Sequence, residues 1–352
     1  MIIANTGDWH LRGKDLDAAR AQLLEMTREC RARGVTLVTI AGDVFDRDNI
    51  GDNHVRTGGV EEVGIEAITA LTDGGIEVLM ILGNHDIAGV GSADALHCFD
   101  NRPLVSIVRE PRVVELTDGL FMACAPWSWA GGDAEAAITA LMPFNALLAH
   151  VQVTGARMSG AFTCEAKPGA WQVSRAFLED IPAVRHIALG DFHARQNLAG
   201  GRGGYVGALR QLNFGEEGNP AGFELWDSET GAVEWVELSA APRYRTITVP
   251  AGQTCAAVEP SDAERLRYRF EGGPPDPVLV AELENAGYSV ESIVTAVERV
   301  RRAEVPAGIA SNPHAMIDLF ASVAEPPIGA ERLAGMHRAH DRVFSDKREV
   351  AA

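Results

Sequence analysis

The first two-thirds of the chain alternate short apolar runs with segments of helical periodicity. The runs are rich in β-branched residues, and runs of this length and composition predict buried strands. They cover residues 1–6, 35–41, 76–82, 146–149 and 186–189. Between the first two runs, Leu16, Ala19, Leu23, Met26 and Cys30 share one helix face, and a second such stretch carries Ile65, Ile68 and Leu71. The alternation predicts an α/β domain.

The last third of the chain changes to shorter strand-like pieces. Residues 223–226 and 233–238 flank Asp-Ser-Glu-Thr-Gly, a hairpin-type turn signal. They complete a first domain that we predict over residues 1–240. A smaller α/β unit follows over residues 243–303, and residues 304–352 form the tail.

The small unit and the tail carry weaker patterns. Candidate strands lie at 246–249 and 266–270, and residues 290–297 fit either a helix face or a strand. The tail beyond residue 304 is predicted to be helical. Its apolar stripe either docks on the coiled coil of a partner or packs back on the same chain, the commoner fate of such a stripe. The stripe consists of Met316, Leu319, Phe320 and Val323.

Composition favours a soluble protein of the cytoplasm. No uninterrupted apolar run approaches the roughly 20 residues that a membrane-spanning helix needs, and the chain begins without a secretion signal, so we expect no membrane partner. The five cysteines are scattered and form no Cys-x-x-Cys pair, which indicates reduced thiols. The net charge of −18 argues against a nucleic-acid partner, because phosphate backbones are normally bound by excess lysine and arginine. Carboxylates that bind metal ions would account for part of the acidity.

Five polar clusters each follow directly after an apolar run. They are Asp8-Trp9-His10, Gly42-Asp43-Val44-Phe45-Asp46, Gly83-Asn84-His85-Asp86, His150 and Gly190-Asp191-Phe192-His193. Because the carboxyl ends of strands line the ligand crevice of open α/β sheets, we expect the five loops to converge. Carboxylate, imidazole and amide ligands suit a pair of divalent cations, which together activate a water and neutralise a phosphodiester. A single Asp-x-His is more often structural, and the five clusters in register are what favour a site.

These clusters resemble the signature of the calcineurin-like metallophosphoesterases: D-x-H, G-D-x-x-D, G-N-H-[DE], H and G-H-x-H. The resemblance covers about the first 240 residues. It implies a two-sheet α/β sandwich core with a small α/β cap domain and a helical C-terminal tail. It also implies two divalent metal ions. Asp8, His10 and His193 would bind the first ion, Asp43 would bridge, and Asn84 and His150 would bind the second.

The resemblance gives His85 a different role, in which it reaches the phosphate and donates a proton or hydrogen bond to the leaving oxygen. Asp46 would orient His85, and a turn-capping role for Asp46 is an equal alternative. The fifth motif departs from the family, because Asp191 replaces its first histidine. An aspartate can bind the second ion and favours manganese or magnesium over zinc, with iron also open. Alternatively, Asp191 contacts no metal and the second site is weak or empty.

Several segments after residue 204 are similar to those of the SbcD-type DNA repair nucleases. They are residues 205–209, 213–218, 222–225 and 242–244. This resemblance implies a DNA exo- or endonuclease subunit of a repair or recombination complex, acting as a homodimer. Its partner would be an SbcC-like, SMC-type coiled-coil ATPase. The cap would face DNA and the tail would dock on the ATPase.

Other functions stay open on the sequence alone. The densest basic stretch either meets a phosphate backbone or forms the solvated face of a strand. It consists of Arg243, Arg245, Arg265, Arg267 and Arg269. The acidic charge, together with Asp46-Arg47, also fits a phosphatase or cyclic-nucleotide phosphodiesterase that acts on a small substrate. A third hypothesis is a scaffold that has lost catalysis through the altered fifth motif and only regulates an ATPase.

Overall fold

The structure is a computed structural model that describes most of the chain. The described residues are 1–46, 59–87, 93–158, 162–250, 255, 261–271 and 276–293, with isolated positions between 314 and 337. The predicted stripe of Met316, Leu319, Phe320 and Val323 lies outside them, as does Arg47. The chain divides into two units. The first comprises Met1–Ile247, Ala257–Tyr268 and Ala286–Ser289, and the second comprises Thr248–Ala256, Arg269–Asn285 and Val290–Ala352.

The first six-stranded sheet of the first unit contains the three N-terminal strands that the sequence predicted. Its order is β14-β13-β1-β2-β3-β4, in which β1 to β4 are parallel. At one edge β13 pairs antiparallel with β1, and β14 pairs antiparallel with β13. The bounds are β1 Ile2–Thr6, β2 Leu37–Ile40, β3 Glu77–Ile81, β4 Val105–Val108, β13 Gly222–Asp227 and β14 Val233–Glu237. Helices α1, Leu16–Ala32, and α2, Val60–Asp73, lie between the parallel strands in sequence.

The second six-stranded sheet has the order β11-β12-β10-β7-β6-β5. Its bounds are β5 Arg112–Thr117, β6 Leu120–Ala125, β7 Ala146–His150, β10 His186–Gly190, β11 Gln196–Asn197 and β12 Gly203–Tyr205. Two short helices, α3 Ala134–Thr139 and α4 Arg175–Asp180, and a two-stranded sheet of β8 Gln152–Thr154 and β9 Gln172–Ser174 complete this half. Strands β6, β7 and β10 are parallel.

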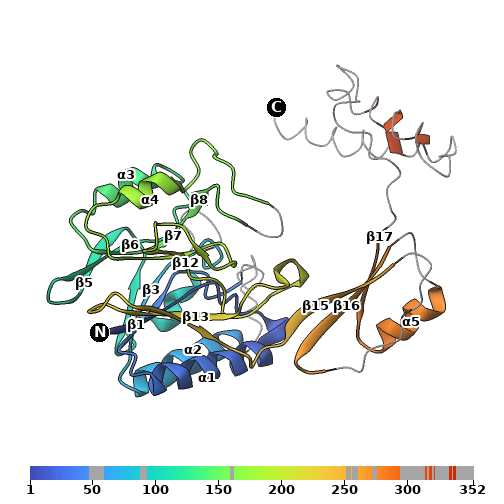
Figure 1. Cartoon of the computed structure of the whole chain (residues 1–352), viewed down its shortest axis with the longest axis horizontal. Helices are drawn as coiled ribbons and strands as arrows, with labels where there is room; N and C mark the ends of the chain where they lie inside the picture. The colour runs from blue at the N-terminus through green and yellow to red at the C-terminus, as the bar shows by residue number, and fades with distance from the viewer. Residues whose placement is uncertain are drawn as a thin grey trace. The chain divides into compact units, whose positions relative to one another are not determined.

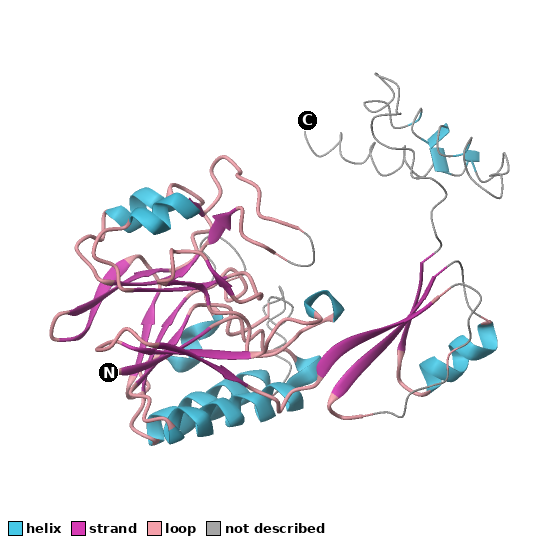
Figure 2. Ribbon diagram, viewed as in Figure 1, coloured by secondary structure: helices cyan, strands magenta, loops and turns pink. Residues whose placement is uncertain are grey.

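The two sheets stack face to face because their strands are apolar on both sides. Alternate residues point to opposite faces of a strand. In β1, Ile3 enters the core between the sheets, whereas Ala4 packs toward α1 and α2. In β7, Leu148 enters the same central core, whereas Leu147 packs toward α3 and α4. The result is a helix, sheet, sheet, helix arrangement (Figures 1 and 2), which confirms the predicted two-sheet α/β sandwich.

A buried polar contact also joins the two sheets. The hydroxyl of Thr39 donates a 2.6 Å hydrogen bond to Asn5 Oδ1, and Asn5 Nδ2 lies 3.0 Å from His186 Nε2. The His186 ring stacks on Trp226 with centroids 4.6 Å apart. Buried polar groups are costly unless they are paired, so this contact fixes how β1, β2 and β10 face one another.

The smaller strands after residue 242 form a separate three-stranded sheet in the order β15-β16-β17. Its strands are β15 Arg243–Val249, β16 Glu264–Glu271 and β17 Ser289–Ile293, and α5 spans Pro277–Asn285. The strands predicted at 246–249 and 266–270 are confirmed as parts of longer ones. Residues 289–293 adopt the strand alternative, and the rest of 290–297 lies outside the described residues. Among the described helices, none combines the length and apolar character required to span a bilayer.

The central core yields a stability test. Leu148 is fully buried between the sheets, so Leu148→Ala should lower the free energy of unfolding by about 2–5 kcal/mol through lost burial and a cavity. Val233→Ala, at a position that is 43% exposed, should change it by no more than about 0.5 kcal/mol. Chemical denaturation measures both. Equal effects of the two substitutions would contradict the assigned core.

Candidate metal centre

All five predicted clusters lie at the carboxyl ends of strands, and both sheets contribute. Asp8 and His10 follow β1, Asp43 follows β2, and Asn84 follows β3 in the first sheet. In the second sheet, His150 ends β7, and Asp191 and His193 follow β10. Because the two sheets stack with these ends together, side chains far apart in sequence reach one another. The convergence expected from the sequence is therefore present.

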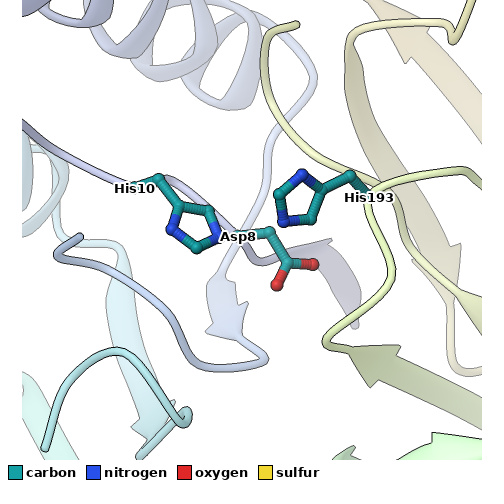
Figure 3. Close-up of side chains that lie close together, drawn as sticks. All are labelled: Asp8, His10 and His193. Carbon is teal, nitrogen blue, oxygen red and sulfur yellow. The ribbon is translucent and has the colours of Figure 1, made fainter. Parts of the chain in front are cut away.

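One group of potential ligands contains Asp8, His10 and His193. Their ligand atoms lie within 4.8 Å of one another, and Figure 3 shows the three side chains gathered at one place. The rings of His10 and His193 have centroids 4.7 Å apart. These are the residues predicted to bind the first ion.

A second group contains Asp8, Asp43 and His150, again within 4.8 Å. Oδ2 of Asp43 lies 3.6 Å from Nε2 of His10 and 3.6 Å from Nε2 of His150, so this carboxylate sits between the two groups, where a bridging ligand belongs. Nε2 of His150 also lies 2.9 Å from Asn84 Oδ1 and 3.7 Å from Asp191 Oδ1. Asp191 is thus close enough to share an ion with His150, despite replacing the usual histidine.

The backbone at these positions is strained. Asp8, His10, Asp43 and Asp191 have φ angles of 51°, 44°, 54° and 109°. Positive φ is unfavourable for residues with a Cβ and tends to cluster at functional sites, where the surrounding structure holds it. Four of the predicted ligands therefore occupy conformations that local sequence preference alone would not select.

Two glycines allow the loops to come this close. A Cβ on Gly42 would lie 2.4 Å from His150 Nδ1, and one on Gly83 would lie 2.1 Å from Asp43 Oδ1. Any side chain at these positions would push a predicted ligand away. The Gly-Asp and Gly-Asn pairs of the motifs are therefore steric requirements of the site.

The donor set fits divalent cations. Among the described residues, Asp8 Oδ2, His10 Nε2 and Asp191 Oδ2 are buried and make no hydrogen bond. Such atoms carry a desolvation cost unless a ligand compensates it. Nδ1 of His150 contacts the Ala41 carbonyl oxygen at 2.6 Å. With the ring proton on Nδ1, the Nε2 lone pair points toward Asn84 Oδ1, another acceptor, and a cation between them would satisfy both.

The electrostatics indicate an excess of buried negative charge. Burial raises the pKa of Asp43 to about 7, and the carboxylates of Asp86 and Asp8 add to the rise. Burial lowers the pKa of His10 well below its usual value, assisted by the neighbouring His193 and His85, which leaves a neutral ring. His150 behaves differently, because burial opposes protonation but Asp43, Asp191 and Asp8 together raise its pKa to about 9. Without bound cations, the positive charge of the protonated His150 ring compensates the negative charge of the neighbouring carboxylates.

His85 lies at the open side of the cluster. Its Nδ1 is 3.3 Å from Asp46 Oδ1, and its ring meets that of His10 edge-on at 4.6 Å. Asp46 also lies 3.5 Å from Arg12 Nη1, and Arg12 is held by hydrogen bonds to Asp15. The Asp46 carboxylate thus lies within reach of both the His85 ring and the Arg12 guanidinium, a position compatible with orienting His85.

Sequence reasoning missed the residues that hold the ligands in place. Asp86 accepts hydrogen bonds from the backbone amides of Asp43, Phe45 and Gly83 at 2.9, 3.0 and 2.9 Å, which fastens two ligand loops together. Glu216 Oε1 lies 2.8 Å from His193 Nδ1 and orients that ring. Asp86 ends the Gly-Asn-His-Asp cluster, and Glu216 lies within residues 213–218, which resemble the SbcD-type nucleases. Both residues therefore lie in segments that the sequence analysis had singled out. Arg12 had no sequence signal.

The Glu216 contact generates a second prediction. Loss of a carboxylate that orients a ligating imidazole typically weakens metal affinity about 10–100-fold, so Glu216→Gln should weaken Mn²⁺ binding by that factor. The amide oxygen of glutamine can still accept the hydrogen bond from the Leu212 amide, which limits damage to the fold. Isothermal titration with Mn²⁺ measures the change. Glu179→Gln, at an exposed position, is the control, and equal affinity in both variants would contradict the role of Glu216.

Comparison with known proteins shows which families this chain resembles. Residues 1–132 match the family model described as calcineurin-like phosphoesterase. Exonuclease subunit 1 of Enterobacteria phage T4 is 26% identical over 259 residues, which cover 67% of each chain. One subunit of the nuclease SbcCD, from Rhodobacter capsulatus, is 26% identical over 333 residues, covering 81% of this chain and 75% of that protein. Residues 1–132 are thus similar to the calcineurin-like phosphoesterases, as the motifs indicated, and that family implies divalent metal ions and hydrolysis of phosphoesters.

Proposed function

We propose that this chain is the nuclease subunit of a DNA-processing complex and cleaves phosphodiesters with two divalent metal ions. The observation that carries the proposal is the convergence of ligand atoms from both sheets around buried, unsatisfied carboxylate and imidazole atoms. Asp8, His10 and His193 would bind one ion. Asn84, His150 and Asp191 would bind the other, and Asp43 would bridge them. Ions held there would lower the pKa of a water and offset charge on the phosphate oxygens.

The donor set supports manganese. Oxygen ligands from Asp8, Asp43, Asn84 and Asp191 outnumber the three imidazoles of His10, His150 and His193. Hard oxygen donors combined with imidazole suit manganese, whereas the described site offers no thiolate for a soft metal. Magnesium, iron or zinc remain chemically compatible with part of this set.

His85 and Asp46 supply the proton chemistry of the proposal. The His85 side chain is 31% exposed, so it can meet an incoming phosphate, and Asp46 at 3.3 Å fixes its ring. His85 would donate a proton or hydrogen bond to the leaving oxygen. General acid catalysis of this kind contributes about 10²- to 10⁴-fold in rate.

The names of the relatives support DNA and a protein partner. One is called an exonuclease subunit and the other a nuclease subunit of SbcCD. We infer that this chain is likewise a nuclease subunit. From its resemblance to the SbcD-type nucleases we further propose that it works as a homodimer with an SMC-type coiled-coil ATPase in DNA repair or recombination. Residues 243–303 would form the DNA-facing cap, and residues 304–352 would dock on the ATPase.

The basic stretch contributes less to DNA binding than its charge suggests. Arg243, Arg245 and Arg269 lie 2.8, 3.4 and 3.0 Å from the carboxylates of Glu237, Glu264 and Glu291. Arg267 covers the Phe214 ring at 4.5 Å. Partly neutralised arginines favour the alternative of a solvated strand face, and they are the observation that keeps a phosphatase or small-substrate phosphodiesterase as the second candidate.

Three substitutions test the proposed chemistry. Asp8→Ala and Asp43→Ala should abolish Mn²⁺-dependent cleavage of DNA together with metal binding. His85→Ala should keep the metal and lose about 10²- to 10⁴-fold in kcat. Cleavage of end-labelled oligonucleotides and metal content by mass spectrometry check both. EDTA should stop cleavage, and added Mn²⁺ should restore it.

Asp118→Ala, at an exposed position, is the matched control and should behave as the unsubstituted protein. Cleavage that persists in all three variants would overturn the site assignment. Hydrolysis of bis(p-nitrophenyl) phosphate with no cleavage of DNA would favour the small-substrate alternative. Metal-free protein that binds an ATPase would favour the scaffold.

A further inference from the structure

Two paired segments beside the candidate metal centre, residues 157–158 and 162–163, expose two large apolar side chains, and we refer to these four residues as the hairpin. Phe162 is 74% exposed and Met158 is 41% exposed. They face each other across the hairpin, because the Met158 amide donates a 2.9 Å hydrogen bond to the Phe162 carbonyl. Arg157 and Thr163 form the adjacent bridge. Single exposed apolar residues are common on protein surfaces, but these two are paired and lie next to predicted ligands, which makes them a candidate contact surface.

The hairpin is fastened directly to the loop of the fifth cluster. Gln196 Oε1 accepts a 2.7 Å hydrogen bond from the Arg157 amide, and Gln196 Nε2 donates to the Arg157 carbonyl at 2.6 Å and to the Ala194 carbonyl at 3.1 Å. Gln196 follows His193 by three residues. The described base of the hairpin is therefore held in a fixed place relative to a predicted ligand.

A pocket of about 340 Å³ connects the hairpin with the predicted ligands. Its wall includes Met158, Asp191 and His193, and the side chains of Gln152, Asn213 and Asn219 add amide groups. This volume lies in the range of small-molecule sites. Among the described residues that line the pocket, none is a lysine or an arginine, and Asp191 and Glu216 are acidic. Asp191 and His193 would hold the cations that meet the phosphate. The rest of the wall, with Met158 and the amides, carries no cationic side chain and suits an uncharged, flat group with polar edges.

We propose that the hairpin and this pocket form a nucleobase subsite, which binds one unpaired base of the strand whose phosphodiester lies at the predicted ligands. Phe162 and Met158 would contact the face of the base, and the amides would meet its polar edge. This inference rests on the proposed nuclease function and deepens it. Stacking on an aromatic ring requires no positive charge, so it suits a chain with a net charge of −18, in which Arg243, Arg245 and Arg269 already contact carboxylates.

The test compares an intact oligonucleotide with one that lacks a single base next to the cleaved bond. Stacking of one base on an aromatic side chain is worth roughly a 5- to 150-fold change in affinity. Phe162→Ala should raise Kd for the intact strand by that factor, and Met158→Ala by less. On the abasic strand the two proteins should differ by less than about twofold. Phe162→Trp should retain tight binding, because the ring face is kept.

Binding is measured by fluorescence anisotropy in the His85→Ala background, so that cleavage does not consume the probe. Phe121→Ala, which removes an aromatic ring that is 37% exposed on β6, is the matched control. An equal loss on intact and abasic strands would overturn the base contact, as would unchanged binding in Phe162→Ala. An unsubstituted protein that hydrolyses bis(p-nitrophenyl) phosphate but neither binds nor cleaves DNA would instead reject the nuclease function itself.

Discussion

The structure is organised around buried negative charge at the meeting point of two sheets. Asp8 and Asp43 are almost completely inaccessible to solvent and lie with His150 in one cluster. Carboxylates this close repel one another strongly in a dry interior, unless cations or protons compensate them. Asp86 is different, because three backbone amides satisfy it. Asp8 and Asp43 each accept a single backbone amide on Oδ1, from Asp191 and His85 respectively, so their negative charge is less well compensated than that of Asp86.

The sandwich core and the candidate centre depend on each other. Each sheet supplies only part of the predicted ligand set, and the contact from His150 to the Ala41 carbonyl crosses from the second sheet to the first. The central core, with Leu148 two residues before His150, sets the distance between the sheets. Positive φ angles at four predicted ligands, among them Asp8 and Asp43, add strain that this packing must offset. Rigid support of this kind keeps a cation site at its required geometry.

The sequence predicted what is local and missed what depends on distant contacts. Strands β1, β2, β3, β7 and β10 could be predicted because each is a mostly apolar run, buried except at its first residue in β1 and β3, followed by ligand-type residues. Strand β5 could not, because half-exposed residues give it no continuous apolar run. Glu216 holds His193 from 23 residues away, and Arg12 reaches Asp46 across 34 residues, so no spacing rule reveals either partner. Amino-acid composition likewise does not reveal which arginines form ion pairs with glutamates.

These arginine–glutamate pairs bear on how a protein as acidic as this one could bind DNA. Phosphate contacts by free lysine and arginine normally supply most nucleic-acid affinity, yet here Arg243, Arg245 and Arg269 already contact carboxylates. Positive charge at the candidate centre would come from the ions that its own carboxylates attract. Attraction for a phosphodiester would then be concentrated at one point, instead of being spread along a backbone groove. Positioning a DNA strand relative to that point would require further contacts beside it. The apolar hairpin, which is held to the loop after His193, lies where it could make them.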